Sequence, residues 1–368
     1  MIKLQKRGEY KREYIKENSI VKKIFCFYRK MLDNSTKLVY NNKDANKQHH
    51  KFKGDFLMKK IISLVLVLAF VLVGFVACNK TTDEGNNGTT TAVTATEKSY
   101  TLALAVDTAI SGTKVSNNVM ALVIDADNKI VAARIDCVEA TPELDEAGAL
   151  VAQASVTTKV ELGAAYSGMK AGSWADQAKA FETWLVGKSA ADVAGAEITG
   201  TLVAGCTMTS SMATFKALVA EAFATANKVE FKTSDPVTAG LALNTTVSAS
   251  RSGGATVSTD VAVVAIAGSK VAATVLDSIE QSFSITEGAL VAGEVSLSKA
   301  EQGDAYSMPK GTWINQAKAF SASTVGKTVA ELNDLEVVSD ALAAAGCTMQ
   351  NTTAGYKTTI IKAAASAK

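Results

Sequence analysis

The feature that most constrains the fold of this chain is an internal repeat that covers most of its length. The stretch VMALVIDADNKIVAARID at 119–136 is matched by VAVVAIAGSKVAATVLD at 261–277, which is one residue shorter in the turn. The stretch AGCTMTSSMATFKALVAEAFATA at 204–226 is matched in the same way by AGCTMQNTTAGYKTTIIKAAASA at 345–367. Because a long repeat is one structural unit used twice, the sequence predicts two tandem repeated domains.

We place these domains at residues 99–230, the first segment, and at residues 236–368, the second segment. They are joined by a turn-rich linker around Pro236. In each segment two runs of β-branched residues flank a short turn, which predicts a β-hairpin. A further strand is expected near 151–160 and, at the matching place, near 291–297.

Helices are expected after these strands. Apolar residues over 174–186 recur at a spacing that places them on one face of an amphipathic helix, and Gly187 would end it. Thr209 or Ser210 can cap another helix that runs through Phe223. Strands followed by helices predict an α+β fold, in which each segment is a small antiparallel sheet with packed helices.

A secretory signal precedes the repeat, at residues 58–77. Lys59 and Lys60 form a short basic region, the apolar run 61–77 follows, and the run ends at Cys78. The residues before the cysteine resemble a bacterial lipoprotein box, which predicts that Cys78 carries acyl chains such as palmitate and becomes the N-terminus. The alternative is an uncleaved membrane anchor, although the apolar run is shorter than the roughly 20 residues that a bilayer span needs.

Residues 1–57 come before this signal and are rich in Lys, Asn, Ile and Tyr, as translated A/T-rich DNA is. Lys53-Gly54-Asp55 can be encoded with a ribosome-binding GGAG, so we interpret 1–57 as a mis-annotated upstream segment. The alternative is a basic cytoplasmic arm. Residues 78–98 are rich in Thr, Asn and Gly and predict a flexible tether.

Charge and composition exclude several classes of function for the part that follows the signal. Residues 78–368 contain 21 Lys and Arg against 30 Asp and Glu, a net charge of −9. An acidic body is poorly suited to nucleic acid, because phosphates require neutralising cations. Both histidines, His49 and His50, lie upstream, which excludes histidine-based triads and imidazole metal sites from the repeat. We therefore expect no catalytic residues and no metal site, and a protein that is not an enzyme by itself.

The repeated residues resemble a family of bacterial extracytoplasmic lipoproteins with one or two FMN-binding-type domains. The resemblance rests on ALVIDADNKIVAARID, then AYSGMKAGSWADQAKAFETWLVGK, then AGCTMTSSMATFKALVAEAF, and it covers most of the chain after the signal, twice. In flavinylated relatives a flavin transferase joins FMN through a phosphoester to a threonine before the last helix. The resemblance places that threonine at Thr207 and Thr348.

The sequence around these threonines differs from the family's Ser/Thr-Gly-Ala-Thr, because both segments read Ala-Gly-Cys-Thr. Thr207 and Thr348 either attach FMN or satisfy backbone groups near a helix. Gly205 and Gly346 either let the backbone approach a phosphate or form turns. FMN, bound covalently or noncovalently, is the one cofactor implied.

Cysteines and tryptophans also recur and leave alternatives open. Cys206 and Cys347 are equivalent, whereas Cys137 has no counterpart; we favour small buried thiols over an interdomain disulfide. Trp174 and Trp313 could stack on a flavin ring, but their helical spacing favours the core.

Two functions are consistent with these observations. The first is a membrane-tethered flavin carrier on the extracytoplasmic face of a bacterial cell membrane, with a flavin transferase and a membrane redox partner. The second is a surface lipoprotein whose tandem domains bind a ligand or partner, or serve a structural role, without a cofactor. The sequence leaves the oligomeric state open.

Overall fold

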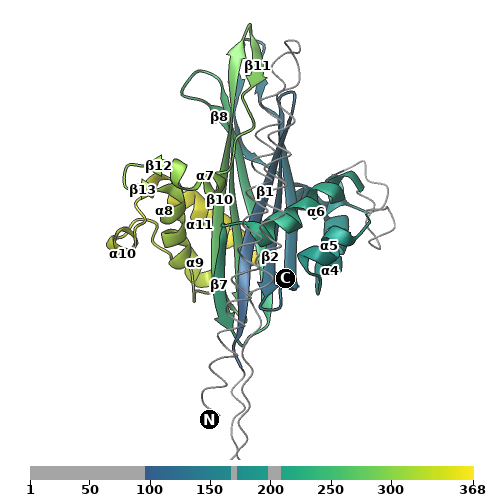
Figure 1. Ribbon diagram of the computed structural model, residues 1–368. Coiled ribbons are helices and arrows are strands. Elements are labelled where there is room, and N and C mark those ends of the chain that lie inside the picture. Colours follow the sequence, from purple (N-terminus) through teal and green to yellow (C-terminus); the bar gives the residue numbers. More distant parts are fainter. Residues whose placement is uncertain (1–95, 167–171, 198–208) are drawn as a thin grey trace, which may run out of the picture. The chain divides into compact units, whose positions relative to one another are not determined.

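Runs of β-branched and alternating apolar residues form two large antiparallel sheets (Figure 1). The computed structural model describes residues 96–166, 172–197 and 209–368. The first sheet has the order β3-β2-β1-β7. Its strands are β1 (Lys98–Ser111), β2 (Lys114–Asp125), β3 (Ile130–Ala140) and β7 (Lys228–Thr233).

The second sheet has the order β11-β10-β9-β8-β6 and takes one strand from the first segment. Its own strands are β8 (Val237–Ala249), β9 (Ala255–Ala267), β10 (Lys270–Thr286) and β11 (Ala289–Ala292), and the added strand is β6 (Gln153–Val156). Two short ribbons complete the strands: β4 (Glu143–Leu144) with β5 (Leu150–Val151), and β12 (Ser307–Met308) with β13 (Gly311–Thr312).

Helices follow the strands in both segments, so the expected α+β class is confirmed. The first segment has α3 (Lys159–Leu162), the 3-10 turn η1 (Gly163–Ala165), α4 (Trp174–Leu185), α5 (Ala190–Gly195) and α6 (Thr209–Ala224). The second has α7 (Lys299–Gln302), η2 (Gly303–Ala305), α8 (Trp313–Ala322), α9 (Val329–Asn333), α10 (Asp340–Ala344) and α11 (Gln350–Ala365). Capping boxes open α3, α4, α5, α7 and α9, because a Ser or Thr side chain and an acidic residue three positions later exchange bonds with the backbone.

Several local expectations hold. The hairpin of β2 and β3 is present, and the helix expected over 174–186 is α4. Gly187 follows it with a positive φ of 80°, a conformation that favours glycine. The second expected helix is α6, which already contains Thr209 and Ser210, so neither residue is its N-cap.

Three expectations need correction. The strand expected over 151–160 is broken, and its last residues belong to α3 because Thr158 caps that helix. The strand expected over 291–297 ends at Ala292. After Gly293, which still donates to Ser282 O of β10, the Gln281 side chain takes the place of a strand partner by bonding the backbone of Glu294 and Ser296. Strand β7 runs past the boundary expected at residue 230 because it pairs with β1 up to Thr233, and β8 begins directly after Pro236.

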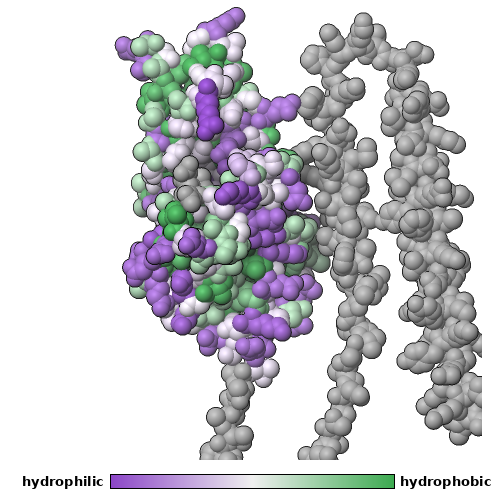
Figure 2. Space-filling view, turned by 90° about the vertical axis from the view of Figure 1, so that its left-hand side faces the viewer, coloured by the Kyte–Doolittle hydropathy of each residue, from purple (hydrophilic) through white to green (hydrophobic). Residues whose placement is uncertain are grey.

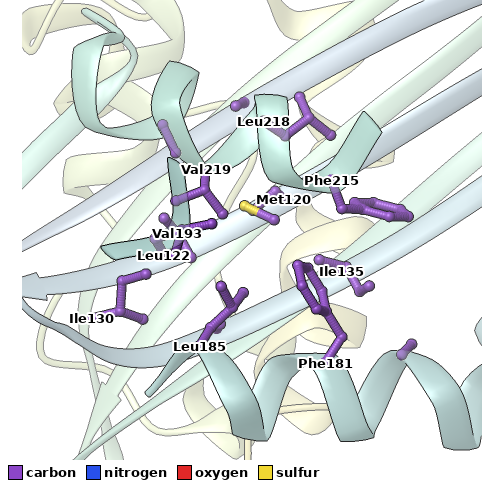
Figure 3. Packing of buried hydrophobic residues seen from close by; sticks show 14 of the residues in the cluster. Met120, Leu122, Ile130, Ile135, Phe181, Leu185, Val193, Phe215, Leu218 and Val219 are labelled. Atoms are coloured by element: carbon purple, nitrogen blue, oxygen red, sulfur yellow. The ribbon is translucent and has the colours of Figure 1, made fainter. Parts of the chain in front are cut away.

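Apart from a smaller cluster around Phe283 and Val257, which joins strands of both segments, the core lies in three layers of apolar side chains. One lies between the first sheet and the helices α4 and α6, where Phe181 and Phe215 reach Met120 and Leu122 of β2 (Figure 3). A matching layer lies between the second sheet and its helices, and Figure 1 shows the two sets of helices on opposite sides of the strands. The third layer lies between the sheets and draws on both segments, from Leu104 and Val119 to Leu243 and Val263.

Buried polar side chains cross this central layer. Asn117 of β2 is 1% exposed; its Nδ2 donates to Thr259 Oγ1 at 2.8 Å, and its Oδ1 accepts from Thr108 Oγ1 at 2.9 Å. Thr259 Oγ1 also lies 2.9 Å from Thr245 Oγ1. Asn227 Nδ2 donates to the carbonyl of Leu276 at 3.2 Å. The described residues accordingly all belong to one compact unit.

Asn117→Ala should lower the free energy of unfolding by about 1–3 kcal/mol, because it leaves the buried hydroxyl of Thr259 and the half-buried hydroxyl of Thr108 without their amide partner. Asn118→Ala is the matched control, since its neighbouring amide makes only a 3.4 Å contact with Asp107 near the surface. Urea unfolding of both variants measures the difference. Equal losses would show that the bonds between the sheets contribute nothing specific.

Candidate functional site

Thr348 lies in the short connection between α10 and α11. Gly346 comes two residues earlier with φ 96°, and its N–H donates to the carbonyl of Ala343, which ends α10. The next N–H, of Cys347, donates to Leu342 O at 2.8 Å. Gly346 therefore forms a turn that requires a left-handed backbone. It places Thr348 two residues before the first residue of α11.

Gln316 of α8 holds Thr348 in place. Both the N–H and the hydroxyl of Thr348 donate to Gln316 Oε1, at 2.9 and 3.0 Å. The Gln316 side chain is 1% exposed, and its Nε2 faces the carbonyl of Lys310 at 3.4 Å and Met308 Sδ at 3.7 Å. One buried amide thus ties the β12–β13 hairpin to the residue before α11. Sequence reasoning missed this role, although a glutamine on the buried face of an apolar helix was a usable signal.

The N-terminus of α11 lies next to Thr348 in the chain. Helix α11 begins two residues after Thr348, and a helix N-terminus carries a partial positive charge that favours anions. Cys347 packs inward at 5% exposure, and burial raises the pKa of its thiol. Thr348 itself is half-buried. The arrangement therefore places a hydroxyl, which donates to Gln316, directly before the start of a long helix.

The other residues of the sequence-based site have different outcomes. Thr207, Gly205 and Cys206 lie outside the described residues, as does Cys78. Cys137 and Cys347 are buried free thiols, as expected. Trp174 and Trp313 are core residues at 1% and 2% exposure, so the structure supports the packing alternative for both.

Two buried aspartates at equivalent positions of the two segments bond the N-terminal turns of short helices. Asp136 Oδ1 accepts from the N–H groups of Cys137 and of Val160, in the first turn of α3, at 2.7 and 3.1 Å. Asp277 Oδ1 accepts from Ser278 and from Ala300, in the first turn of α7, at 2.8 and 3.0 Å. Burial raises the pKa of Asp136 to about 6 and that of Asp277 to about 7, despite these bonds.

A buried lysine is the first residue of each of these short helices. Lys159 Nζ bonds Glu139 at 3.1 Å and lies 4.8 Å from the ring centroid of Tyr166. At the matching place Lys299 Nζ bonds Glu280 at 2.7 Å and lies over the ring of Tyr306. These lysines have their charges paired and their stems buried, so they join the short helices to β3 and β10 and offer no free cation.

A small cavity of about 80 Å³ lies where the two segments meet. Its walls include Arg134 and Asp136 from the first segment and Lys362 and Ser366 from the second. Arg134 is 5% exposed and its Nη1 is 3.5 Å from the Glu182 carboxylate, whose pKa burial raises. Positive and negative groups balance around the cavity, and its volume suits a few water molecules.

Other kinds of site find no support in the part of the chain that the structure describes. There, no three His, Cys, Asp or Glu side chains gather as metal ligands, and no helix is long and apolar enough to span a bilayer. On the face that carries the helices of the second segment, apolar residues are interspersed with hydrophilic ones (Figure 2). Comparison of the chain with known protein families, with curated proteins and with solved structures gives no match. 

Asp277→Asn should flatten the pH dependence of stability. The folded-state pKa of Asp277, about 7, lies above its usual 3.8, so between these values the folded protein keeps a proton that the unfolded chain has released. The free energy of unfolding therefore decreases as the pH rises through this window, by up to about 4 kcal/mol, and the asparagine removes that contribution.

Urea unfolding at about pH 5 and about pH 8 measures this slope. The exposed Asp304, on the adjacent η2, supplies the control variant Asp304→Asn, which should keep the wild-type slope. An identical slope in wild type and Asp277→Asn would contradict the assignment of a buried, proton-retaining carboxyl.

Proposed function

We propose that this chain is a lipid-anchored extracytoplasmic protein with two duplicated FMN-binding-like domains that carry flavin for electron transfer. The observation that carries the proposal is the placement of Thr348, which lies directly before the N-terminus of α11. Its hydroxyl donates to the buried Gln316 of α8. The chain is proposed to act with a flavin transferase and a membrane redox partner, and not as an enzyme by itself.

The duplication is supported by equivalent contacts at matching positions. Asp136 and Asp277 each bond the first turn of a short helix that opens with a capping box. The tryptophans that begin α4 and α8 are both buried against an aromatic residue of the last helix, Phe215 or Tyr356. Such polar and aromatic agreements are hard to explain by shared composition alone, which favours one ancestral unit used twice.

The residues around Thr348 fit a phosphate group. Its oxygen lies beside the positive end of a 16-residue helix, and Gln316 can turn its Nε2 amide toward an anion in place of its carbonyl. FMN, when bound, supplies the redox chemistry. The chain's own contribution is to position the attachment oxygen and to bury the turn behind it, through Cys347 and Leu342. By the same resemblance Thr207 is the proposed attachment residue of the first segment.

The proposed location follows from the basic and apolar stretch that ends at Cys78. Lipidation there would tether the domains to a bacterial cell membrane through residues 78–98. We expect the mature protein to begin at acylated Cys78, without residues 1–77. Mass spectrometry of the N-terminal peptide from the native host measures this. Residues 1–57 still attached, or an unmodified Cys78, would refute the anchor.

Covalent flavin can be tested on a denaturing gel. Co-expression with a flavin transferase should give a band that fluoresces after denaturation, because a phosphoester survives unfolding. Thr348→Ala should remove part of the fluorescence, and the double variant with Thr207→Ala all of it. Thr348→Ser is the matched control, since it keeps the attachment oxygen and should keep the signal.

A second function is favoured by the same hydrogen bonds. Gln316 Oε1 already accepts hydrogen bonds from the N–H and the hydroxyl of Thr348, so both donors have a partner without any ligand. In that case the chain is a cofactor-free surface module that binds a ligand or partner or serves a structural role. A dark gel from folded protein, with a transferase that labels a control substrate, would overturn the flavin proposal and favour this one.

A further inference from the structure

Part of strand β1 has an edge that no other described strand covers. Strand β7 pairs with β1 only over residues 98–103, and the last bond on that side joins the N–H of Leu104 to Asn227 O at 3.2 Å. The pairing of β1 with β2 continues without a bulge to Ser111, so the backbone groups alternate strictly. Val106, Thr108 and Ile110 therefore direct their N–H and C=O groups away from β2. No described residue pairs with them.

The matching edge of the second sheet is covered. Val106 pairs with Val119 as Leu243 pairs with Val261, so Thr245 and Val247 of β8 correspond to Thr108 and Ile110. There β6 lies antiparallel to β8, with Val156 opposite Thr245 and Gln153 opposite Val247. Thr245 and Val247 are each 1% exposed, whereas Thr108 and Ile110 are only half-buried. The difference marks a strand position that β6 fills on one sheet and that no described strand fills on the other.

We propose that this edge, residues 105–111 of β1, binds the same edge of a second copy of the chain about a two-fold axis at Thr108. Pairing is antiparallel, as for β6 on β8. Thr108 then faces the second copy's Thr108, and Val106 faces the second copy's Ile110. A two-fold contact uses the same patch on both partners, and the first sheets of the two copies become one continuous sheet.

Three features of the sequence fit this register. With the axis at Thr108, Ser111 of the second copy faces Ala105. The second strand therefore ends one residue before Leu104, whose N–H already donates to Asn227 O. Apolar Val106 and Ile110 are brought opposite each other on the inner face. Asp107 and Ala109 are exposed on the outer face of the single chain. In the dimer Asp107 lies opposite the second copy's Ala109, so no carboxylate directly opposes another.

The register makes opposite predictions for two substitutions at one exposed residue. Ala109→Lys places an ammonium opposite the second copy's Asp107, twice per dimer, and should tighten the dimer by roughly threefold to tenfold. Ala109→Asp places a carboxylate there and should weaken it by a similar factor. Sedimentation equilibrium of the full chain, with its lipidation status held constant, measures the dissociation constants.

Two proline variants test the backbone bonds. Thr108→Pro removes an N–H at the centre of the proposed contact, at an edge position where proline is compatible with a strand, and should give a monomer. Glu230→Pro places proline on the edge strand β7, where the N–H faces away from β1, and should leave the dimer unchanged. Circular dichroism confirms that each variant is folded, and if Thr108→Pro unfolds, the Ala109 pair decides.

A monomeric wild-type chain at all concentrations would overturn the proposal. So would a dimer that responds equally to Ala109→Lys and Ala109→Asp, since its interface would then lie elsewhere. Capture of residues 293–297 of the same chain by this edge would appear as a monomer and would also refute it.

Discussion

The apolar layer between the two sheets is the constraint on which the rest of the structure depends. Each sheet has one face covered by its own helices, and the opposite face carries leucine and valine side chains that water would otherwise reach. Burying such a face contributes about 25 cal/mol per Å² of apolar surface, so neither sheet is well suited to exist without a partner. The apolar faces of the two sheets cover each other, and the two segments therefore share one core.

Polar contacts within that layer determine how the sheets align. Asn117, Thr245 and Thr259 form a hydrogen-bonded row between strands of different segments. A shift of either sheet along its strands would leave these groups buried and unsatisfied, at a cost that apolar contacts alone do not impose. The strand β6 reinforces the same alignment by leaving the first segment and joining the second sheet.

The candidate site around Thr348 depends on this alignment indirectly, through the helices that pack on the second sheet. The sheet and its central layer hold β9 and β10 in place, and α8 and α11 pack on their outer face. Gln316 extends from α8 to Thr348 and accepts from it through Oε1. Its Nε2 faces the carbonyl of Lys310 and the sulfur of Met308 in the β12–β13 hairpin. The attachment residue proposed here is therefore positioned by a buried side chain on a regular element and not by its loop alone, which is the better basis for a defined geometry.

The sequence by itself determined the local elements and the α+β class. The turn residues between β2 and β3, the helical spacing over 174–186 and the glycine that ends it are local signals, and each is read from a few neighbouring residues. It also singled out Thr348 and Gly346 as a turn before a helix, because the repeated motif precedes a helical pattern in both segments.

Only the tertiary structure decided how these elements combine. The exchange of β6 into the other sheet, the pairing of β7 with β1 and the bond between Gln316 and Thr348 join residues that are far apart in the chain. Pairings of this kind depend on which apolar faces are left to cover once the local elements exist. The sequence pattern shows that a face is apolar, but the choice of its partner is made by the packing of the whole unit.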